Sequence, residues 1–179
     1  DPNLYGIDEL ETLIKTELQQ LQSTFTMDFG PLNLSITIAD ESGWDDWKMQ
    51  YPPISMTEHL TIIPDWAEYS PHEEERVIRI EPGIAFGTGD HPTTRLAIQA
   101  MSQYLTPEST VFDVGTGSGI IALSAGALGA QSVTAFDLDE TATTNAQHHV
   151  EMNQLGSVVQ VQTNNLLEGI SATASIIVA

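Results

Sequence analysis

Short apolar runs alternate with amphipathic segments through the C-terminal half of the chain. The runs predict strands, and the segments between them have helical periodicity, as in the helix expected near residues 140–153. Consecutive strands separated by helices must be joined by right-handed crossovers, which place the strands parallel in one sheet. The pattern therefore predicts an α/β fold with an open parallel sheet. Its predicted strands are residues 110–114, 132–136, 158–162 and 175–178, and its other helices are 93–105 and a segment ending at Leu128.

Four strands are fewer than a doubly wound sheet of this kind usually contains, which is about six. The last predicted strand runs into Ala179, and the chain starts at Asp1 without an initiator Met. We therefore expect a piece of a longer protein in which the C-terminal part of the sheet is incomplete.

The N-terminal region has a different pattern. A helix over residues 10–21 and an alternating strand over 32–38 are too few elements for a core, so residues 1–43 are expected to be a fragment of a small α+β domain. Residues 44–80 contain all three Trp residues and four prolines. We interpret them as a connector with short strands at 60–63 and 77–80, packed onto its neighbours by its aromatic side chains. An aromatic patch that binds a peptide is the alternative.

The charge balance limits the partners. The chain has 25 acidic residues against five Lys and Arg, a formal net charge of −20. Such a surface repels nucleic-acid phosphates and anionic membranes, and it attracts a basic protein, although acidity can also serve solubility alone. No Cys is present, which excludes disulfides, a thiolate nucleophile and a Cys-based zinc site. With no apolar stretch of membrane-spanning length and no secretory signal, we expect a cytoplasmic protein.

A glycine-rich turn follows the first strand of the predicted sheet. It reads Asp113-Val114-Gly115-Thr116-Gly117-Ser118-Gly119, and its glycines let the backbone turn tightly and approach a ligand. The helix after it offers unpaired N–H groups to an anionic group. The spacing differs from the dinucleotide fingerprint, and the absence of a nearby Lys argues against a nucleoside triphosphatase.

An acidic residue ends the next strand. Asp137 stands where a carboxylate can accept hydrogen bonds from both ribose hydroxyls of a nucleoside, and Leu138 can cover a face of the adenine ring. The alternative is that Asp137 caps the following helix, a role that we assign to Asp139 instead. Asn165, after the third strand, can bind the adenine edge or simply form a turn.

The other polar residues are explained by structural roles. Thr93 and Thr94 are expected to cap a helix, with Pro92 in its first turn. His91 lacks the partners of a catalytic triad and is interpreted as structural. His148 and His149 point to different faces of one helix, so we predict no metal site.

The loop residues Asp113–Gly119 followed by Phe136-Asp137-Leu138-Asp139 resemble the cofactor core of class I S-adenosylmethionine-dependent methyltransferases. Upstream segments narrow the resemblance to the ribosomal protein L11 methyltransferase (PrmA) family. These are Trp44-x-x-Trp47-Lys48, Ile63-Pro64-x-Trp66 and the run from Pro82 through Phe86-Gly-Thr-Gly-Asp-His91 to Thr94. The resemblance covers residues 44–179 and implies a Rossmann-like methyltransferase sheet over 81–179. Residues 1–43 would then belong to the N-terminal domain that recognises the substrate.

The resemblance implies that Thr94, Gly115 and Asp137 match cofactor-binding positions of the family. The whole predicted S-adenosylmethionine site is Thr94, Asp113, Gly115, Thr116, Gly117, Asp137, Leu138 and Asn165, and no catalytic residue is assigned. The chain departs from the family at Asn164-Asn165, where Gly-Asp is common, and at His149, which replaces the first Asn of an Asn-x-x-x-Asn pattern that Asn153 completes.

The resemblance also implies an activity: methyl transfer to Lys and N-terminal amines of a ribosomal protein. A fragment lacking strands of the sheet is expected to be inactive alone. Three alternatives remain open, namely a family member acting on another protein or a small molecule, a cofactor-binding module without catalysis, and a dinucleotide-dependent oxidoreductase.

Overall fold

The computed structural model describes residues 7–24, 34, 51–82 and 91–179. The chain divides into two compact units, residues 1–48 and residues 49–179, and each is described by itself. In the first unit, helix α1 spans Ile7–Thr24 and confirms the helix predicted over 10–21. Lys15 and Glu11 form an ion pair one turn apart on this helix. The strand predicted over 32–38 lies outside the described residues, apart from Leu34.

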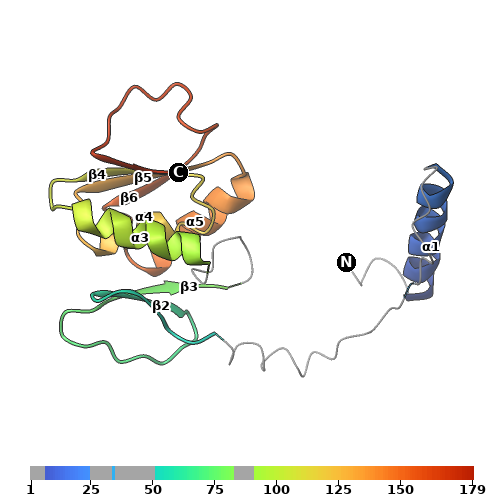
Figure 1. Cartoon of the computed structure of the whole chain (residues 1–179), viewed down its shortest axis with the longest axis horizontal. Coiled ribbons are helices and arrows are strands. Elements are labelled where there is room, and N and C mark those ends of the chain that lie inside the picture. The colour runs from blue at the N-terminus through green and yellow to red at the C-terminus, as the bar shows by residue number, and fades with distance from the viewer. Residues whose placement is uncertain (1–6, 25–33, 35–50, 83–90) are drawn as a thin grey trace. The chain divides into compact units, whose positions relative to one another are not determined.

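A four-stranded parallel sheet dominates the second unit (Figure 1). Its strands are β4 (Thr110–Val114), β5 (Ser132–Asp137), β6 (Val159–Thr163) and β7 (Ile176–Val178), in the spatial order β6-β5-β4-β7. All three pairings are parallel, with Val114 opposite Phe136 and Asp137 opposite Thr163. The four predicted strands and their parallel arrangement are confirmed. The register also brings the loops that follow β4, β5 and β6 to one edge of the sheet.

Three helices accompany these strands: α3 (Pro92–Tyr104), α4 (Ile120–Ala127) and α5 (Glu140–Met152). Pro92 lies in the first turn of α3 and Asp139 caps α5, accepting from the Thr141 N–H at 2.8 Å, as predicted. The expected threonine cap of α3 is wrong. His91 is the capping residue, and its Nδ1 accepts from the Thr93 N–H at 3.3 Å because the helix begins one residue earlier than expected.

Residues 51–82 form a small sheet, which includes both strands predicted at 60–63 and 77–80. It has the order β1 (Ile54–Thr57), β2 (Leu60–Pro64) and β3 (Arg76–Ile80), with β1 antiparallel and β3 parallel to the fully buried β2. Strand β1 was not predicted. The Arg79 guanidinium fixes the crossover between β2 and β3 by donating to the carbonyls of Asp65 and Ala67.

Aliphatic side chains pack this sheet onto the helices, so the prediction that aromatic side chains do so is wrong for the described residues. Trp66 is 38% exposed, whereas Leu60, Ile63 and Ile78 are completely buried. Trp44 and Trp47 lie outside the described residues. The central strand β2 is buried along its whole length, which favours branched aliphatic side chains over Tyr and Trp, whose polar groups need a hydrogen-bond partner when buried.

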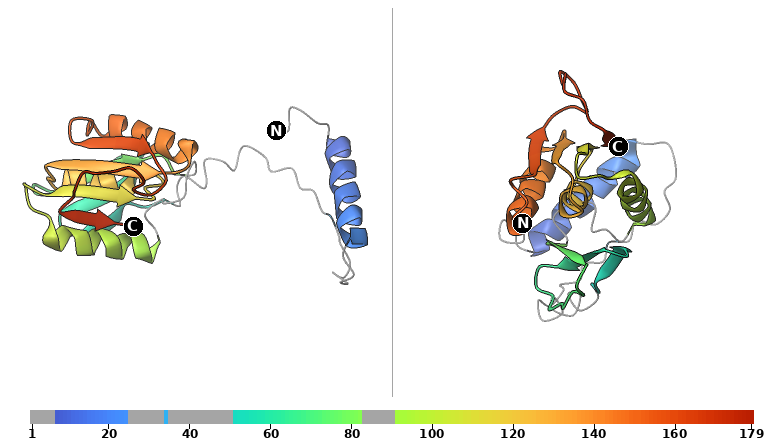
Figure 2. Two further views of the ribbon diagram at one scale, coloured as in Figure 1. Left: turned by 90° about the horizontal axis from the view of Figure 1, so that it is seen from above. Right: turned by 90° about the vertical axis from the view of Figure 1, so that its left-hand side faces the viewer.

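The helices α3, α4 and α5 lie between the two sheets, as two perpendicular views show (Figure 2). One continuous hydrophobic cluster joins the layers, with Ile62 and Ile78 from the small sheet, Leu123 from α4 and Val133 from the parallel sheet. The small sheet is therefore part of the same folded body as the parallel sheet. The predicted domain boundaries at residues 43 and 80 stay predictions.

Candidate functional site

The glycine loop between β4 and α4 is fastened to the end of β5. The carbonyl oxygen of Phe136 accepts hydrogen bonds from both the Gly115 N–H (2.8 Å) and the Thr116 N–H (2.9 Å). Gly115, Gly117 and Gly119 all have positive φ values, a backbone conformation that side chains with a Cβ rarely adopt. Three such residues in five explain why the sequence alternates glycine here. The loop therefore has a defined backbone conformation without a ligand.

Asp113 supports the loop from below. Its Oδ2 accepts from the Thr116 hydroxyl at 2.6 Å and from the Ala122 N–H in the first turn of α4 at 3.0 Å. The side chain is 1% exposed, and burial raises the pKa of the Asp113 carboxyl to about 6, against the two hydrogen bonds that favour its charged form. Asp113 and Thr116 were predicted to bind a cofactor. The structure gives both a direct role in shaping the loop, and their contact with a ligand stays a prediction.

Asp137 bridges the glycine loop and the start of α5. One carboxylate oxygen accepts from the Gly117 N–H at 2.8 Å, and the other accepts from the Asp139 N–H at 3.1 Å. The side chain remains only partly buried, and an ionised carboxylate can accept about four hydrogen bonds. Acceptor capacity is therefore left for a donor that approaches from the open side of the loop.

The described residues leave space next to Gly115. A Cβ atom built on this glycine would meet none of their heavy atoms within 4 Å, so a ligand can approach the backbone closely there. Next to Asp137, the Leu138 side chain is 69% exposed although it is apolar. An exposed leucine beside a carboxylate suits a ligand with one polar and one apolar part. This agrees with the predicted contacts to ribose and adenine, which themselves stay predictions.

The two remaining predicted residues are Asn165 and Thr94. Asn164 N–H donates to the Asp137 carbonyl at 2.8 Å, which brings the loop after β6 to the same edge. Asn165 is exposed and its amide donates to Glu168 at 3.2 Å, so no hydrogen bond joins it to the glycine loop within the described residues. Thr94 is half-buried in the first turn of α3. Hydrogen bonds in and around the glycine loop thus bring together five of the eight predicted residues, namely Asp113, Gly115, Thr116, Gly117 and Asp137. Leu138 follows Asp137 in the chain.

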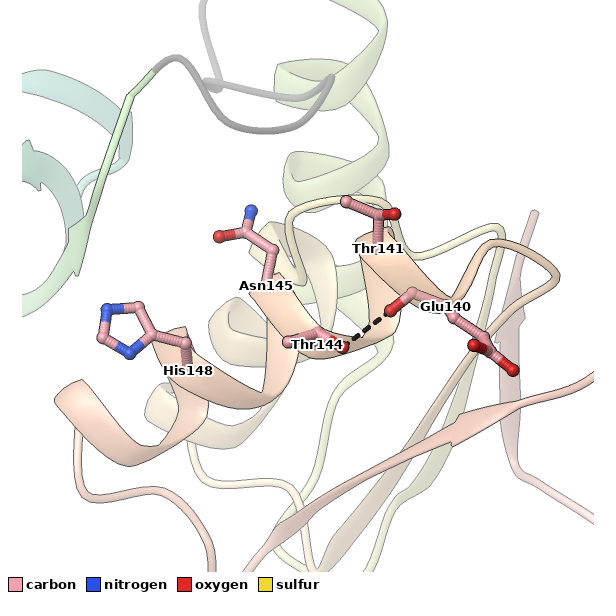
Figure 3. Close-up of a pocket in the computed structure, with 5 residues that line it drawn as sticks. All are labelled: Glu140, Thr141, Thr144, Asn145 and His148. Atoms are coloured by element: carbon pink, nitrogen blue, oxygen red, sulfur yellow. Dashed lines mark hydrogen bonds between the residues drawn. The ribbon is translucent and has the colours of Figure 1, made fainter.

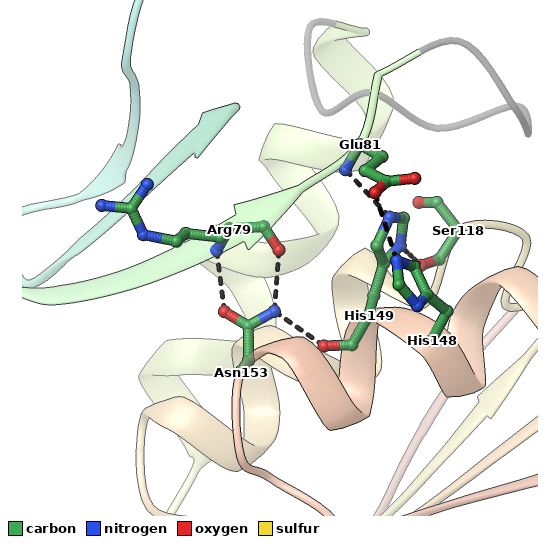
Figure 4. A network of polar contacts seen from close by, with 6 residues as sticks. All are labelled: Arg79, Glu81, Ser118, His148, His149 and Asn153. Atoms are coloured by element: carbon green, nitrogen blue, oxygen red, sulfur yellow. Dashed lines mark hydrogen bonds and ion pairs between the residues drawn. The ribbon is translucent and has the colours of Figure 1, made fainter. Parts of the chain in front are cut away.

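A polar network behind the loop was not foreseen (Figure 4). His149 is completely buried, its Nε2 accepts from the Glu81 N–H at 2.9 Å, and its Nδ1 lies 2.8 Å from the Ser118 carbonyl. His148 is exposed, and its Nε2 lies 3.3 Å from a carboxylate oxygen of the same Glu81. The centroids of the two rings are 5.9 Å apart and both rings reach Glu81, so the prediction that they point to different faces is wrong. The one signal in the sequence was the replacement of a family Asn by His149. Among the residues that the structure describes, no cluster of His, Asp and Glu is arranged to hold a metal ion.

A cavity of about 530 Å³ lies along α5 (Figure 3). Asn145 is 6% exposed, and its Nδ2 has no hydrogen-bond partner in the described part of the chain. The glycine loop and Asp137 are not among the residues described at this cavity, which are Glu140, Thr141, Thr144, Asn145 and His148. We therefore place the candidate site at the strand ends, where several loops converge, rather than along the helix.

The charge of the site selects among ligands. No Lys or Arg occurs between residues 96 and 179, the region that contains the whole parallel sheet. Two carboxylates, Asp113 and Asp137, flank the glycine loop instead. A pyrophosphate would meet no positive side chain from this region, whereas a ligand carrying positive charge would be favoured.

A parallel sheet with a glycine loop after one strand and an acid at the end of the next defines a Rossmann-like α/β domain of the methyltransferase type. Comparison with known proteins identifies the family. The sequence model of the ribosomal protein L11 methyltransferase (PrmA) family matches residues 6–179. The chain therefore belongs to this family, and the resemblance seen in the sequence is confirmed.

Individual relatives agree with this assignment. The chain is 43% identical over 172 residues to a ribosomal protein L11 methyltransferase of an Exiguobacterium species and 43% identical over 175 residues to that of Bacillus pumilus. These matches cover 96% and 97% of the chain but only 54% and 55% of the two relatives. The chain thus spans about half the length of the curated relatives that it matches.

A solved structure supports the fold. The crystal structure of the ribosomal protein L11 methylase from Lactobacillus delbrueckii subsp. bulgaricus superposes with a TM-score of 0.63 at 36% identity, covering 71% of this chain and 65% of that one. Among the described residues, no helix is both long and apolar enough to cross a bilayer.

Proposed function

We propose that this chain is the cofactor-binding part of an S-adenosylmethionine-dependent methyltransferase that modifies amines of ribosomal protein L11. The proposal rests on membership of the family, whose Exiguobacterium and Bacillus pumilus members are named ribosomal protein L11 methyltransferase, and on a site that fits the cofactor. The observation that carries it is the Asp137 carboxylate held 2.8 Å from Gly117 N–H beside an open glycine loop.

Each part of the site has a match in the cofactor. Asp137 would accept from the ribose hydroxyls, Leu138 would cover one face of the adenine, and Gly115 would let the ligand approach the backbone. The N-terminus of α4 and Thr94 would face the methionine carboxylate. Asn165 would lie at the adenine edge. Asp113 and Thr116 would keep the loop in the conformation that these contacts need.

The charge of the site supports this ligand over a dinucleotide. S-adenosylmethionine has a positive sulfonium and a positive ammonium group, and it carries no phosphate. A region with two carboxylates and no Lys or Arg from residue 96 onward stabilises such a ligand. The same region would give a pyrophosphate no cationic partner, so the dinucleotide-dependent oxidoreductase is disfavoured.

The chemistry asks little of the protein beyond positioning. When bound, the cofactor supplies a methyl group made electrophilic by the sulfonium, and an amine displaces it in line. A Lys amine is mostly protonated at neutral pH because its pKa is about 10.4, so desolvation near the site must favour the neutral form. This chain's residues would hold the cofactor and exclude water. No general base is assigned.

The remaining predictions complete the proposal. Residues 1–43 would belong to the domain that recognises the ribosomal protein, and the net charge of −20 would favour a basic substrate. Methylation by this chain alone is not expected, because the chain spans about half of its relatives.

The role of Asp137 can be separated from loop bracing by comparing two ligands. We expect Asp137→Ala to weaken binding of S-adenosylhomocysteine by about 1–3 kcal/mol, the scale of lost hydrogen bonds to a charged group. The intact protein should also bind 2′,3′-dideoxy-S-adenosylhomocysteine more weakly, and Asp137→Ala should remove that preference. Titration calorimetry measures both effects.

Asp139→Ala is the matched control, since Asp139 is the next carboxylate along the chain and only caps α5. It should cost about 1 kcal/mol of stability and leave the preference for ribose hydroxyls unchanged. Equal weakening of both ligands by Asp137→Ala would show that this carboxylate only shapes the loop. No binding of either ligand to the intact protein would overturn the proposed function itself.

A further inference from the structure

The C-terminal half of α5 closes the free edge of β3. Asn153 accepts from the Arg79 N–H at 2.7 Å and donates to the Arg79 carbonyl at 2.7 Å, as a neighbouring strand would do. One turn earlier, His149 accepts from the Glu81 N–H at 2.9 Å. Figure 4 shows both side chains reaching the same edge.

The geometry of helix and strand explains this match. Four residues of a helix advance about 6 Å, and two residues of a strand advance about 6.6 Å. His149 near the end of α5 and its C-cap Asn153, four residues apart, can therefore meet Glu81 just after β3 and Arg79 within it, whose N–H groups point to the same side. Side chains at the end of α5 therefore pair with backbone groups at the edge of the small sheet, as a further strand would do.

His149 extends this connection to the glycine loop. Its second ring nitrogen lies 2.8 Å from the carbonyl oxygen of Ser118, which is one residue after Gly117. The backbone N–H of Glu81 can only donate and the Ser118 carbonyl can only accept. The ring must therefore be the neutral tautomer with its proton on Nδ1. One imidazole thus joins the end of the small sheet to the loop that also holds Asp137.

We propose that His149 is a positioning residue of the cofactor site, which sets the conformation of the glycine loop through Ser118 and ties the loop to Glu81 at the end of the small sheet. The role rests on the proposed function, because it acts through the loop that would hold S-adenosylmethionine.

The arrangement is sensitive to protonation. A proton on Nε2 would replace the acceptor that the Glu81 N–H needs, so the bridge exists only with a neutral ring. Burial lowers the pKa of His149, and the charge of His148 lowers it further, whereas the Ser118 carbonyl and the carboxylates of Glu81 and Asp65 raise it. The bridge should therefore persist at neutral pH and be lost as the pH falls below the value of a free histidine, about 6.5.

Three variants test the proposal in the intact protein. His149→Gln keeps one donor and one acceptor without titrating, His149→Phe keeps the ring volume without either, and His148→Gln is the control at the adjacent exposed position. Affinity for S-adenosylhomocysteine is measured by calorimetry between about pH 5 and about pH 8, a range that spans histidine titration.

We expect the unmodified protein to lose roughly tenfold in affinity across the acidic part of this range, in line with typical coupling between sites. His149→Gln should keep the neutral-pH affinity within about threefold and show a smaller loss at acidic pH, because its amide does not titrate and only the Asp113 carboxyl, with a pKa of about 6, still does so at this loop. His149→Phe should bind roughly tenfold more weakly at every pH. His148→Gln should keep the pH dependence of the unmodified protein.

Amide hydrogen exchange in the ligand-free protein separates positioning from general loss of stability. His149→Phe should accelerate exchange at Gly117 and Gly119 while amides in β5 and β6 remain protected. Equal acceleration throughout would show that His149 has a merely structural role. So would a pH dependence in His149→Gln as large as that of the unmodified protein, because Asp113 would then account for all of it. If the protein binds no S-adenosylhomocysteine but exchange at the loop still depends on His149, the proposed function fails while the positioning of the loop stands.

Discussion

The glycine loop after β4 and the connection of residues 164–175 after β6 lie at the same edge of the sheet, but they are held in different ways. The glycine loop is fixed from three directions, by Asp113 below it, by the end of β5 beside it and by His149 behind it. Residues 164–175 are bonded to the sheet at their two ends, where Asn164 donates to the Asp137 carbonyl and Ser175 to the Thr110 carbonyl, while the Asn164 amide donates to Leu166 and Glu168 within the connection.

This difference separates a prepared part of the site from an adaptable one. The glycine loop is braced by buried groups, so a ligand there meets a backbone that is already in place and little ordering entropy is lost. The connection after β6 is largely exposed and includes Leu166 at a φ of 51°, a strained conformation for leucine. Affinity for a nucleoside should therefore come mostly from the β4 and β5 side.

The largest effect is expected when alanine replaces one glycine in each region. Gly119 (φ +83°) and Gly169 (φ +73°) both have left-handed backbones, but a Cβ at Gly119 would lie 3.1 Å from the Ala146 Cβ. A Cβ at Gly169 would meet no atom of the described part of the chain within 4 Å. Gly119→Ala should cost about 3 kcal/mol, from backbone strain and overpacking together, and Gly169→Ala about 1 kcal/mol, from strain alone. Urea unfolding measures both. Equal costs would contradict the close approach of the glycine loop to α5.

An intermediate effect is expected at the buried carboxylate. The pKa of Asp113 is raised to about 6 in the folded protein from an ordinary 3.8, so its contribution to stability is greatest below about pH 4 and is lost as the pH rises through about 6. Asp113→Asn keeps an acceptor for Thr116 and Ala122 and cannot ionise. The variant should therefore gain about 1–3 kcal/mol relative to the unmodified protein between acidic and neutral pH.

Glu168→Gln serves as the control for this titration, since Glu168 is an exposed carboxylate in the other region. Its free energy of unfolding should follow that of the unmodified protein within about 0.5 kcal/mol at both pH values. If Asp113→Asn shows no pH-dependent gain, then the carboxylate is not buried as the structure has it.

The smallest effect is expected at Leu166. Its side chain is 67% exposed and contributes little packing, while its φ of 51° suits asparagine better. Leu166→Asn should stabilise the protein by about 0.5 kcal/mol, measured as a higher midpoint of urea unfolding. A loss of stability instead would show that this connection is packed against something, and the contrast between the two regions would fail.

The parallel sheet could be predicted from the sequence because its signals are local. Apolar runs, helical periodicity and glycines at a strand end are visible within windows of a few residues, and β4 was predicted with its observed bounds. The brief strand β1 was missed because four residues give too little periodicity to recognise. The expected aromatic packing of residues 44–80 failed for the described residues because burial depends on neighbours distant in the chain, here α3, α4 and α5.

The candidate site likewise has features that local sequence predicts and features that depend on tertiary packing. The sequence by itself determined where the glycines and carboxylates stand relative to the strands, since the order of strand, turn and helix follows from the residues on either side. Only the tertiary structure decided that Asp113 lies buried beneath the loop and that His149 joins Glu81 to Ser118, residues separated from it by 68 and 31 positions. The physical reason is that a side chain's hydrogen-bond partners depend on which backbone groups the packed helices and strands leave unpaired beside it, and no local pattern records that.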